Sequence, residues 1–189
     1  MAGHSVPVLL WRITALELPR VVRRCSRCDL ARPFVSSGCF RVNAQKRRLD
    51  VWLIHRCSIC DETWNAPVAE RVSPESLGER LDAYHSNDEV LARRLAFAVP
   101  GADCAVRYVV ERPRHAAPAI VRVRLVDPVA VRLDRLLAGE LAVSRGEIAR
   151  WAETGALGAL DPRRRVTDGL EIRWDSGGVP LGVLAASTP

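Results

Sequence analysis

The sequence predicts a two-part α+β protein, and three observations predict that class. Two Cys-x-x-Cys pairs are separated by 28 residues that contain a β-hairpin pattern. Two helix-capping signals follow the second pair, and a further strand-and-helix pattern begins after residues 112–119, which are rich in Arg, Pro, His and Ala. We therefore expect a cysteine-bearing domain with helices over 1–111, a linker over 112–119, a small helix-plus-sheet module over 120–175 and a tail over 176–189.

The first domain should begin with a strand and continue into a hairpin. Residues 6–18 are apolar enough for a first strand, although Arg12 and Glu17 interrupt them. The β-rich runs 40–44 and 49–55 are joined by Gln45-Lys46-Arg47-Arg48, which predicts a hairpin between the two cysteine pairs. The hairpin would bring the pairs to one place.

Two helices should follow the second cysteine pair. Ser73-Pro74-Glu75 offers an N-cap, a proline at the first helical position and an acidic first turn, and Asn87-Asp88-Glu89 offers a second cap. Leucine and other apolar residues recur at helical spacing after each cap, and Pro100-Gly101 ends the second helix. Residues 103–111 are predicted to form a strand.

The module over 120–175 opens with an alternating strand, residues 120–126. A helix is expected around 131–137, and Ser144 with Glu147 forms a capping-box pattern that opens a second helix ending at Gly155. Residues 156–160 and 170–174 are short strand candidates, connected by turns at Pro162-Arg-Arg-Arg165 and Asp168-Gly169.

The two cysteine pairs predict a structural zinc site of the ribbon type. A tight turn at each pair directs two thiolates at one centre, and two such turns supply the four sulfurs in a tetrahedron that zinc favours. A site closed by four protein ligands leaves no position for a substrate. We therefore predict that zinc is the cofactor and that its ligands are Cys25, Cys28, Cys57 and Cys60.

Two alternatives to zinc remain open at this point: redox chemistry at one or both pairs, and unrelated buried thiols. The redox interpretation lacks the strand-then-helix context of a thioredoxin-like motif. Cys39 and Cys104 belong to neither pair and are expected to be small core residues. His55 lies two residues before Cys57 and is expected beside the metal site or on the surface rather than as a ligand.

The net charge of +6 belongs to the cysteine-bearing segment. Residues 1–72 carry 12 basic and 6 acidic side chains, whereas residues 127–189 carry 8 and 9. A basic hairpin is a candidate phosphate-binding surface, and its densest run is Lys46, Arg47 and Arg48. A solvated turn of charged residues is the simpler alternative.

The module resembles the RNA-binding domain of ribosomal protein S-four, pseudouridine synthases and tyrosyl-tRNA synthetases, also called the alpha-L motif. The resemblance rests on Arg132-Leu-Asp-Arg-Leu-Leu137, Ser144-Arg145, Gly155-Ala-Leu157 and Asp168-Gly-Leu-Glu-Ile172. It implies two helices against a small sheet, with RNA contacts at Arg132, Arg135 and Arg145. The Val-Asn-Gly turn usual in that family is replaced by Gly158-Ala-Leu-Asp-Pro162, and the module is slightly acidic overall.

The chain as a whole resembles the family catalogued as domain of unknown function 1062. That resemblance covers Trp11-Arg-Ile-Thr14, both cysteine pairs, residues 40–46, residues 49–55 and Cys60-Asp-Glu-Thr-Trp-Asn65. It implies that these segments form one coherent unit.

These observations lead to an expected function in RNA or ribosome binding, without catalysis and with zinc as a scaffold. No nucleophile elbow or phosphate-cradling glycine loop is present in the sequence. A protein-interaction adaptor is the alternative, and a redox or zinc-dependent enzyme is the third. Because no apolar run reaches a membrane-spanning length and no export signal is apparent, we expect a cytoplasmic protein whose partners are structured RNA, the ribosome or another protein, and not a membrane. The basic hairpin is expected to contribute more to RNA binding than the acidic module.

Overall fold

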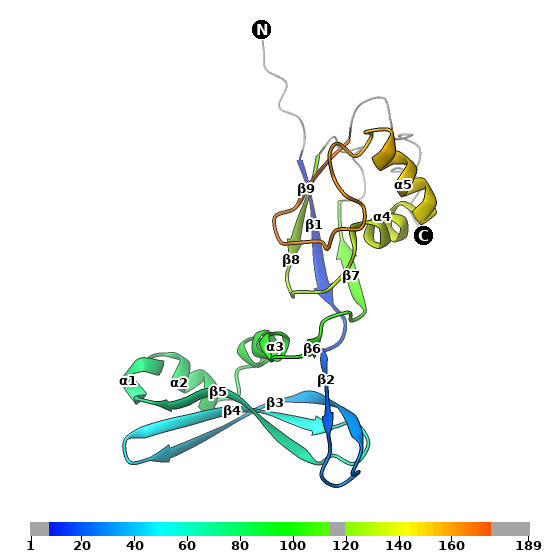
Figure 1. The fold of residues 1–189 in the computed structure, drawn as a ribbon. Coiled ribbons are helices and arrows are strands. Elements are labelled where there is room, and N and C mark those ends of the chain that lie inside the picture. Colours follow the sequence, from blue (N-terminus) through cyan, green and yellow to red (C-terminus); the bar gives the residue numbers. More distant parts are fainter. Residues whose placement is uncertain (1–7, 114–119, 175–189) are drawn as a thin grey trace. The chain divides into compact units, whose positions relative to one another are not determined.

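The computed structural model describes residues 8–113 and 120–174 and divides the chain into two compact units. Unit 1 contains the residues up to Leu16 and those from Arg107 onward, and unit 2 contains Glu17–Val106. Unit 2 is therefore inserted into the sequence of unit 1. Strands and helices occur in both units (Figure 1), which confirms the α+β class.

The sheet of unit 2 is antiparallel and has the strand order β5-β4-β3-β2-β6. Its strands are β2 (Arg20–Arg24), β3 (Ala31–Gln45), β4 (Arg48–Cys57), β5 (Thr63–Val72) and β6 (Ala102–Asp103). The predicted hairpin is confirmed as β3 and β4. Its turn residues Lys46 and Arg47 have φ angles of 48° and 62°, as in the two-residue hairpin turns that match the twist of paired strands.

Three helices lie between β5 and β6 in the chain: α1 (Pro74–Leu77), α2 (Arg80–His85) and α3 (Glu89–Ala98). Both predicted caps form, because Ser73 Oγ accepts from Ser76 N and Asp88 Oδ1 accepts from Leu91 N. The first predicted helix is broken at Gly78, which has a φ of 52°. The helices pack on one face of the sheet and form with it a core that contains Phe40, Val51, Leu53, Leu77, Tyr84, Leu91, Ala92 and Ala96.

An irregularity in β3 corrects the prediction for Cys39. The register of β3 against β4 shifts between Ser36 and Phe40, and Phe40 N donates to Asn87 Oδ1 at 2.7 Å. This bulge turns Cys39 to the solvent, where its side chain is exposed rather than part of a core. Cys104 is half-buried.

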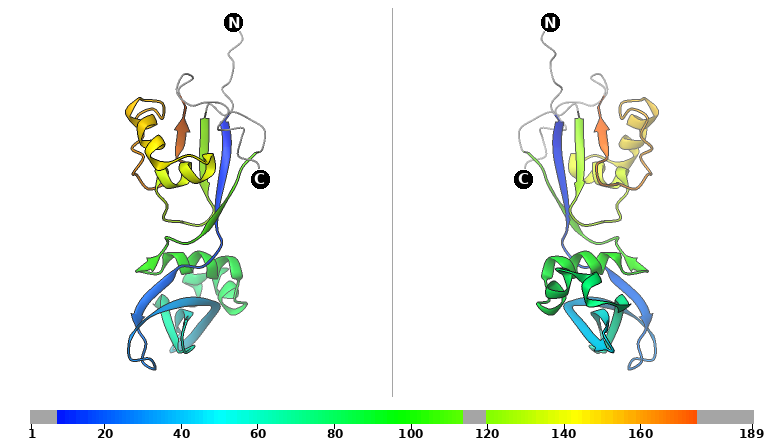
Figure 2. Two further views of the ribbon diagram at one scale, coloured as in Figure 1. Left: turned by 90° about the vertical axis from the view of Figure 1, so that its right-hand side faces the viewer. Right: turned by 90° about the vertical axis from the view of Figure 1, so that its left-hand side faces the viewer.

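Unit 1 is built on a four-stranded mixed sheet with the order β7-β1-β8-β9. Its strands are β1 (Val8–Ala15), β7 (Tyr108–Glu111), β8 (Ile120–Leu125) and β9 (Glu171–Arg173). β1 pairs antiparallel with β7 and parallel with β8, so it lies inside the sheet. Helices α4 (Leu133–Leu141) and α5 (Arg145–Glu153) cover one face of this sheet (Figure 2).

This topology corrects the predicted domain boundaries. The first strand does not belong to the cysteine-bearing domain, because both of its sheet partners come from beyond residue 107. The strand predicted over 103–111 is split into β6 and β7, which belong to different sheets. The strand predicted over 156–160 does not form: residues 156–159 are in turns, with Gly155 and Gly158 at φ angles of 79° and 60°. Residues 114–119 of the predicted linker and the predicted tail over 176–189 lie outside the described residues.

The start of α5 provides a test of local stability in unit 1. Ser144 Oγ accepts from Glu147 N at 3.1 Å and satisfies one of the amides that a helix leaves without an intrahelical partner. Ser144→Ala is expected to lower the free energy of unfolding of unit 1 by about 1 kcal/mol. Denaturant unfolding measures this value, and Ser144→Asp, which retains an acceptor, should stay near the wild type. Equal stability of the alanine variant would show that the cap contributes nothing.

Candidate metal centre and arginine cluster

The four paired cysteines lie at two turns on one end of the unit 2 sheet. Cys25 and Cys28 lie between β2 and β3, and Cys57 and Cys60 lie at the end of β4 and in the turn before β5. The pairing of Phe34 with Cys57 in the β3–β4 ladder brings the two turns together. As predicted, the hairpin between the pairs is what unites them.

The two turns have the same backbone geometry. In the first, Cys25 N donates to Leu30 O at 2.9 Å and Asp29 N donates to Cys25 O at 2.9 Å. In the second, Cys57 N donates to Glu62 O at 2.8 Å and Asp61 N donates to Cys57 O at 3.1 Å. The aspartates have φ angles of 55° and 60°, a left-handed conformation that aspartate tolerates better than most residues. We call residues 25–30 and 57–62 the two knuckles.

The knuckles gather four sulfur atoms around one point. All four Sγ atoms lie within 4.8 Å of one another, and Cys25 Sγ lies 3.5 Å from Cys60 Sγ. All four thiols are free of disulfide bonds. Four sulfurs held about 2.3 Å from a zinc ion in a tetrahedron are about 3.8 Å apart, so this cluster has the size and the donor set of a closed four-thiolate metal site.

The pKa values of two cysteines show the effect of crowding these sulfurs. Burial raises the pKa of Cys57, but hydrogen bonds from the backbone of Ile59 and Cys60 and from neighbouring thiols outweigh it and lower the pKa to about 7. A backbone hydrogen bond from Glu62 lowers the pKa of Cys60, but burial and the neighbouring cysteines outweigh it and raise the pKa to about 12. Ionising a second thiol in the cluster is thus unfavourable, because it would lie beside the first thiolate. A bound cation would offset this repulsion between negative charges.

Aromatic side chains and an arginine pack against the cysteine cluster. Phe34 is buried with Cys25 and Cys57, and Trp64 lies edge-on to it with ring centroids 6.3 Å apart. The guanidinium of Arg23 stacks 3.9 Å from the centroid of Trp64. These side chains form a small core at the knuckles, separate from the core beneath the helices.

Arg27 of the first knuckle binds two groups of the second knuckle. Arg27 NH1 donates to Cys60 O at 3.0 Å, and its Nε lies 3.5 Å from Glu62 Oε2. Glu62 therefore pairs with an arginine. The arginine also places a positive charge beside the sulfurs.

His55 is buried inside unit 2 and does not belong to the four-sulfur cluster. Its Nδ1 lies 3.1 Å from Leu53 O, and its ring lies 5.2 Å from that of Trp64. Burial lowers the pKa of His55, so the ring is neutral at pH 7. The prediction that His55 is not one of the clustered ligands agrees with this geometry, whereas a surface position does not.

The basic run of the hairpin lies at its tip. Lys46, Arg47 and Arg48 are all exposed, and Arg48 NH1 donates to Arg71 O at 3.4 Å. Tight turns with exposed charges fit both the predicted phosphate-binding surface and its solvated alternative.

The three arginines predicted in unit 1 surround the N-terminus of α4. Arg132 is the residue before the helix, Arg135 is exposed in its first turn, and Arg145 opens α5. Asp134 lies between Arg132 and Arg145 and pairs with both, at 2.7 and 2.9 Å. Two of the predicted RNA contacts are therefore already bound to one carboxylate.

Three further arginines join this group, and the sequence analysis assigned them only to a turn. Residues 162–166 run antiparallel to residues 131–134: Leu133 N donates to Arg164 O at 3.0 Å, Asp134 N to Pro162 O at 2.7 Å and Val166 N to Val131 O at 2.9 Å. Three consecutive exposed arginines thus lie beside the start of α4. The run of three basic residues was a signal in the sequence, but its neighbours depended on the fold. We call the following six residues the arginine cluster: Arg132, Arg135, Arg145, Arg163, Arg164 and Arg165.

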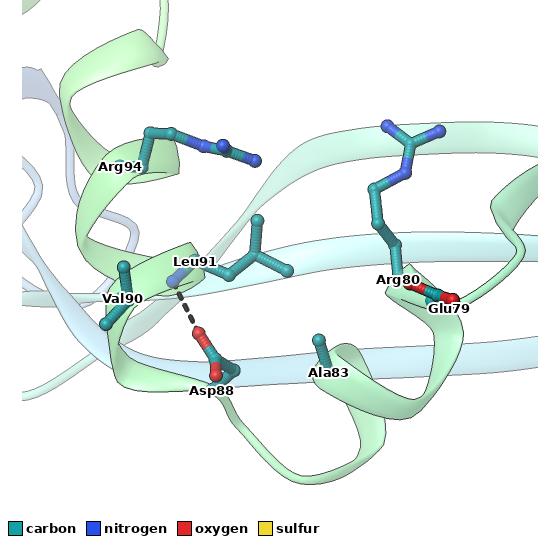
Figure 3. Close-up of a pocket in the computed structure, with 7 residues that line it drawn as sticks. All are labelled: Glu79, Arg80, Ala83, Asp88, Val90, Leu91 and Arg94. Atoms are coloured by element: carbon teal, nitrogen blue, oxygen red, sulfur yellow. Dashed lines mark hydrogen bonds between the residues drawn. The ribbon is translucent and has the colours of Figure 1, made fainter.

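A pocket of about 270 Å³ lies elsewhere in unit 2, between α2 and α3 (Figure 3). Arg80 and Arg94 flank the side chain of Leu91, and Asp88 is used by the cap of α3. None of the clustered cysteines or arginines described above lines this pocket.

The fold and the site together define the class: a two-unit α+β protein with a four-cysteine candidate metal centre. The chain belongs to the family described as Protein of unknown function (DUF1062), whose model matches residues 42–162. The matched range contains the second cysteine pair, α4 and α5. It begins after the first cysteine pair and ends before Arg163. No curated protein and no solved structure matches the chain.

Among the described residues, no helix is both long enough and apolar enough to cross a membrane.

Proposed function

We propose that this protein binds RNA without catalysing a reaction, that the arginine cluster of unit 1 is its main RNA-binding surface, and that zinc held by the four clustered cysteines stabilises unit 2. The single observation that carries the proposal is that three separate segments, which together carry six exposed arginines, meet at the start of α4. Structured RNA, free or in the ribosome, is the partner that such a surface fits.

The separation of charge within the module supports this proposal. Residues 127–189 carry eight arginines and nine acidic residues, and six of those arginines are in the cluster. Four of the acidic side chains have partners outside the cluster: Asp127 accepts from Ala15 N, Glu140 pairs with Arg112, Asp168 with Arg124 and Glu171 with Arg122. The module is slightly acidic as a whole, but arginines outnumber acidic residues in the segments that meet at the start of α4. Phosphate groups respond to the local field rather than to the net charge.

The arrangement of α4 and α5 against β8 and β9 supports an alpha-L-like module. In the resemblance, two helices stand against a small sheet and present basic residues to RNA. This chain departs from a free-standing module because β1 and β7 complete the sheet.

Zinc is the metal that fits the cysteine cluster best in this proposal. Four thiolates in a compact, closed arrangement select zinc or iron among biological metals. A closed site serves structure rather than chemistry. Neither cysteine pair opens a helix, the position that lowers a thiol pKa in redox motifs, so the turns favour a metal site over a redox site.

The test of RNA binding is a salt series on the full-length protein with a fluorescently labelled RNA stem-loop. Changing Arg163, Arg164 and Arg165 together to alanine is expected to lower the slope of log K against log salt by about 2, because each lost phosphate contact removes roughly 0.7 to 0.9. The affinity at low salt should fall with it.

A matched control removes the same charge from arginines of unit 1 outside the cluster. Arg122, Arg124 and Arg173 pair with Glu171 and Asp168 outside the cluster, and changing all three to alanine should leave the slope nearly unchanged. The variant with Lys46, Arg47 and Arg48 changed to alanine measures how much the hairpin contributes to RNA binding. Because of the charge separation, we now expect the cluster to contribute more than the hairpin. An RNA affinity that is absent at low salt, or equal in all variants, would contradict the proposal.

A second candidate function, a protein-interaction adaptor, is favoured by exposed apolar residues at the knuckles. Ile59 is 63% exposed and Leu30 is 57% exposed, one on each knuckle. Apolar side chains on a rigid metal site suit a protein partner. Absence of RNA binding in the salt series would favour this second function.

A further inference from the structure

The side chain of Asp134 lies between Arg132 and Arg145 and accepts five hydrogen bonds. Its Oδ1 accepts from Arg132 Nε at 3.1 Å and from Arg135 N at 2.8 Å. Its Oδ2 accepts from Arg132 NH2 at 2.7 Å, Arg145 Nε at 3.1 Å and Arg145 NH2 at 2.9 Å. Only 8% of this side chain is exposed, so the carboxylate is shielded and fully bonded.

The two guanidinium groups use only one edge each in this arrangement. Both bind Asp134 through Nε and NH2, while their side chains remain 44% and 59% exposed for Arg132 and Arg145. A guanidinium has five N–H groups in a fixed plane, so each arginine keeps further donors beyond those on the carboxylate. Within the part of the chain that the structure describes, those remaining donors have no hydrogen-bond partner.

The charges of this triad do not balance. Two cations share one anion, which leaves one positive charge in excess, and the three exposed arginines of residues 163–165 add to it. Burial opposes ionisation of Asp134, but hydrogen bonds from Arg145 and Arg132 outweigh it and hold the pKa of this carboxyl below its usual range. The carboxylate is therefore ionised at neutral pH and keeps both arginines in place.

We propose that Asp134 is a positioning residue that holds Arg132 and Arg145 as a preformed clamp for a phosphate group. Planar guanidinium forks match the oxygens of a phosphate, and side chains that are ordered before binding lose less entropy on binding. A phosphodiester of RNA and a free or terminal phosphate share this chemistry. The assignment to RNA rests on the function proposed above, whereas the clamp itself does not.

The variant Asp134→Asn separates positioning from simple charge, because the two roles predict opposite results. The substitution removes a negative charge beside two arginines. If the carboxylate only weakened the local positive field, phosphate binding would become tighter in the variant. A carboxylate that orders the clamp cannot be replaced by an amide, whose NH2 group faces guanidinium donors. We expect inorganic phosphate to bind the variant about tenfold more weakly than the wild type, since paired charge-assisted bonds are lost.

The measurement is a titration of the full-length, metal-loaded protein with inorganic phosphate, followed by the arginine Nε–Hε signals in 1H–15N spectra. In the wild type, the signals of Arg132 and Arg145 should shift together. Asp168→Asn is the matched control, because Asp168 binds Arg124, which is not part of the cluster, and its loss changes the net charge equally. Arg145→Lys keeps the charge but loses the fork, and it should weaken phosphate binding even if Asp134→Asn fails to fold.

Each outcome decides the proposal. Phosphate binding that is absent in the wild type, or equal or tighter in Asp134→Asn, would overturn the clamp, as would full affinity in Arg145→Lys. A labelled RNA stem-loop forms the second arm of the experiment. Phosphate binding with the expected losses but no RNA binding would support the clamp and contradict the RNA-binding function.

Discussion

Purified protein is expected to contain one zinc ion per chain, and Cys57→Ser is expected to lose that ion together with the ordered structure of both knuckles. Among the described residues, the buried core at the knuckles contains Cys25, Phe34 and Cys57, with Trp64 and two more cysteines at its edge. So few apolar contacts cannot hold the turns by themselves, and structural zinc supplies folding free energy of about 10 kcal/mol or more in small metal-dependent domains.

The effect of losing the metal should be local. The larger core of unit 2 beneath α1–α3 contains none of the clustered cysteines, so it should stay folded when the metal is lost. Hydrogen exchange of the amides of Cys25, Asp29, Cys57 and Asp61 measures the effect, since these amides close the knuckle turns. Their protection should fall to nearly that of an unfolded chain after Cys57→Ser or after chelation.

Cys39→Ser is the matched control for this experiment. Cys39 is exposed and lies outside the cluster, so the same change there should leave both the zinc content and the exchange rates unchanged. A wild-type protein without metal whose knuckle amides are fully protected would contradict the structural role, and a chain that carries iron instead would contradict the choice of zinc.

The second large effect concerns unit 1: a chain in which residues 17–106 are replaced by Asn-Gly should fold, whereas residues 107–189 alone should not. Leu16 N donates to Arg107 O at 2.8 Å, so the two ends left by the excision are already neighbours, and Asn-Gly is a favoured two-residue hairpin turn. Without β1, the ladders to both β7 and β8 are lost and the buried Trp11 and Ile13 are absent.

The size of this effect follows from the buried side chains of β1. Trp11→Ala in the full chain is expected to cost unit 1 about 3–5 kcal/mol, a large part of the stability of a small domain. Circular dichroism and thermal unfolding of the fragments measure the larger effect, and a peptide of residues 1–16 should restore folding to 107–189 when added. Trp52→Ala, in the half-buried middle of β4, is the control that should leave unit 1 intact. A folded 107–189 fragment would show that β1 is dispensable.

Several parts of the fold were predictable because they depend on neighbours in the sequence. Ser73, Asp88 and Ser144 cap the helices that they were predicted to cap, and the hairpin turns where its polar residues predicted. The four cysteines could be paired into one site for the same reason, because a single hairpin joins the two pairs. The family resemblance was also available from the sequence and is confirmed by the match over 42–162.

The errors came where a local pattern has more than one solution. Residues 156–160 are as apolar as a strand, but the two glycines that flank and interrupt them take positive φ angles and close turns. Cys39 lies where the bulge shifts the register of β3, and its side chain is exposed. A glycine in each segment permits the turn or the bulge, but the conformation that it adopts depends on the surroundings.

The sequence by itself determined the secondary structure near its caps and turns, the four candidate ligands and the basic residues that could bind phosphate. Only the tertiary structure decided that β1 belongs with β8, more than 100 residues away, because strand pairing depends on sheet contacts that no local pattern encodes. The tertiary structure likewise decided the charge of the surface. Residues 127–189 are slightly acidic in sequence, but the fold pairs Asp168, Glu171 and Glu140 with other arginines and brings three arginine-bearing segments together at the start of α4, where Asp134 binds Arg132 and Arg145. Electrostatic fields depend on distances in space, and a sum along the chain does not contain them.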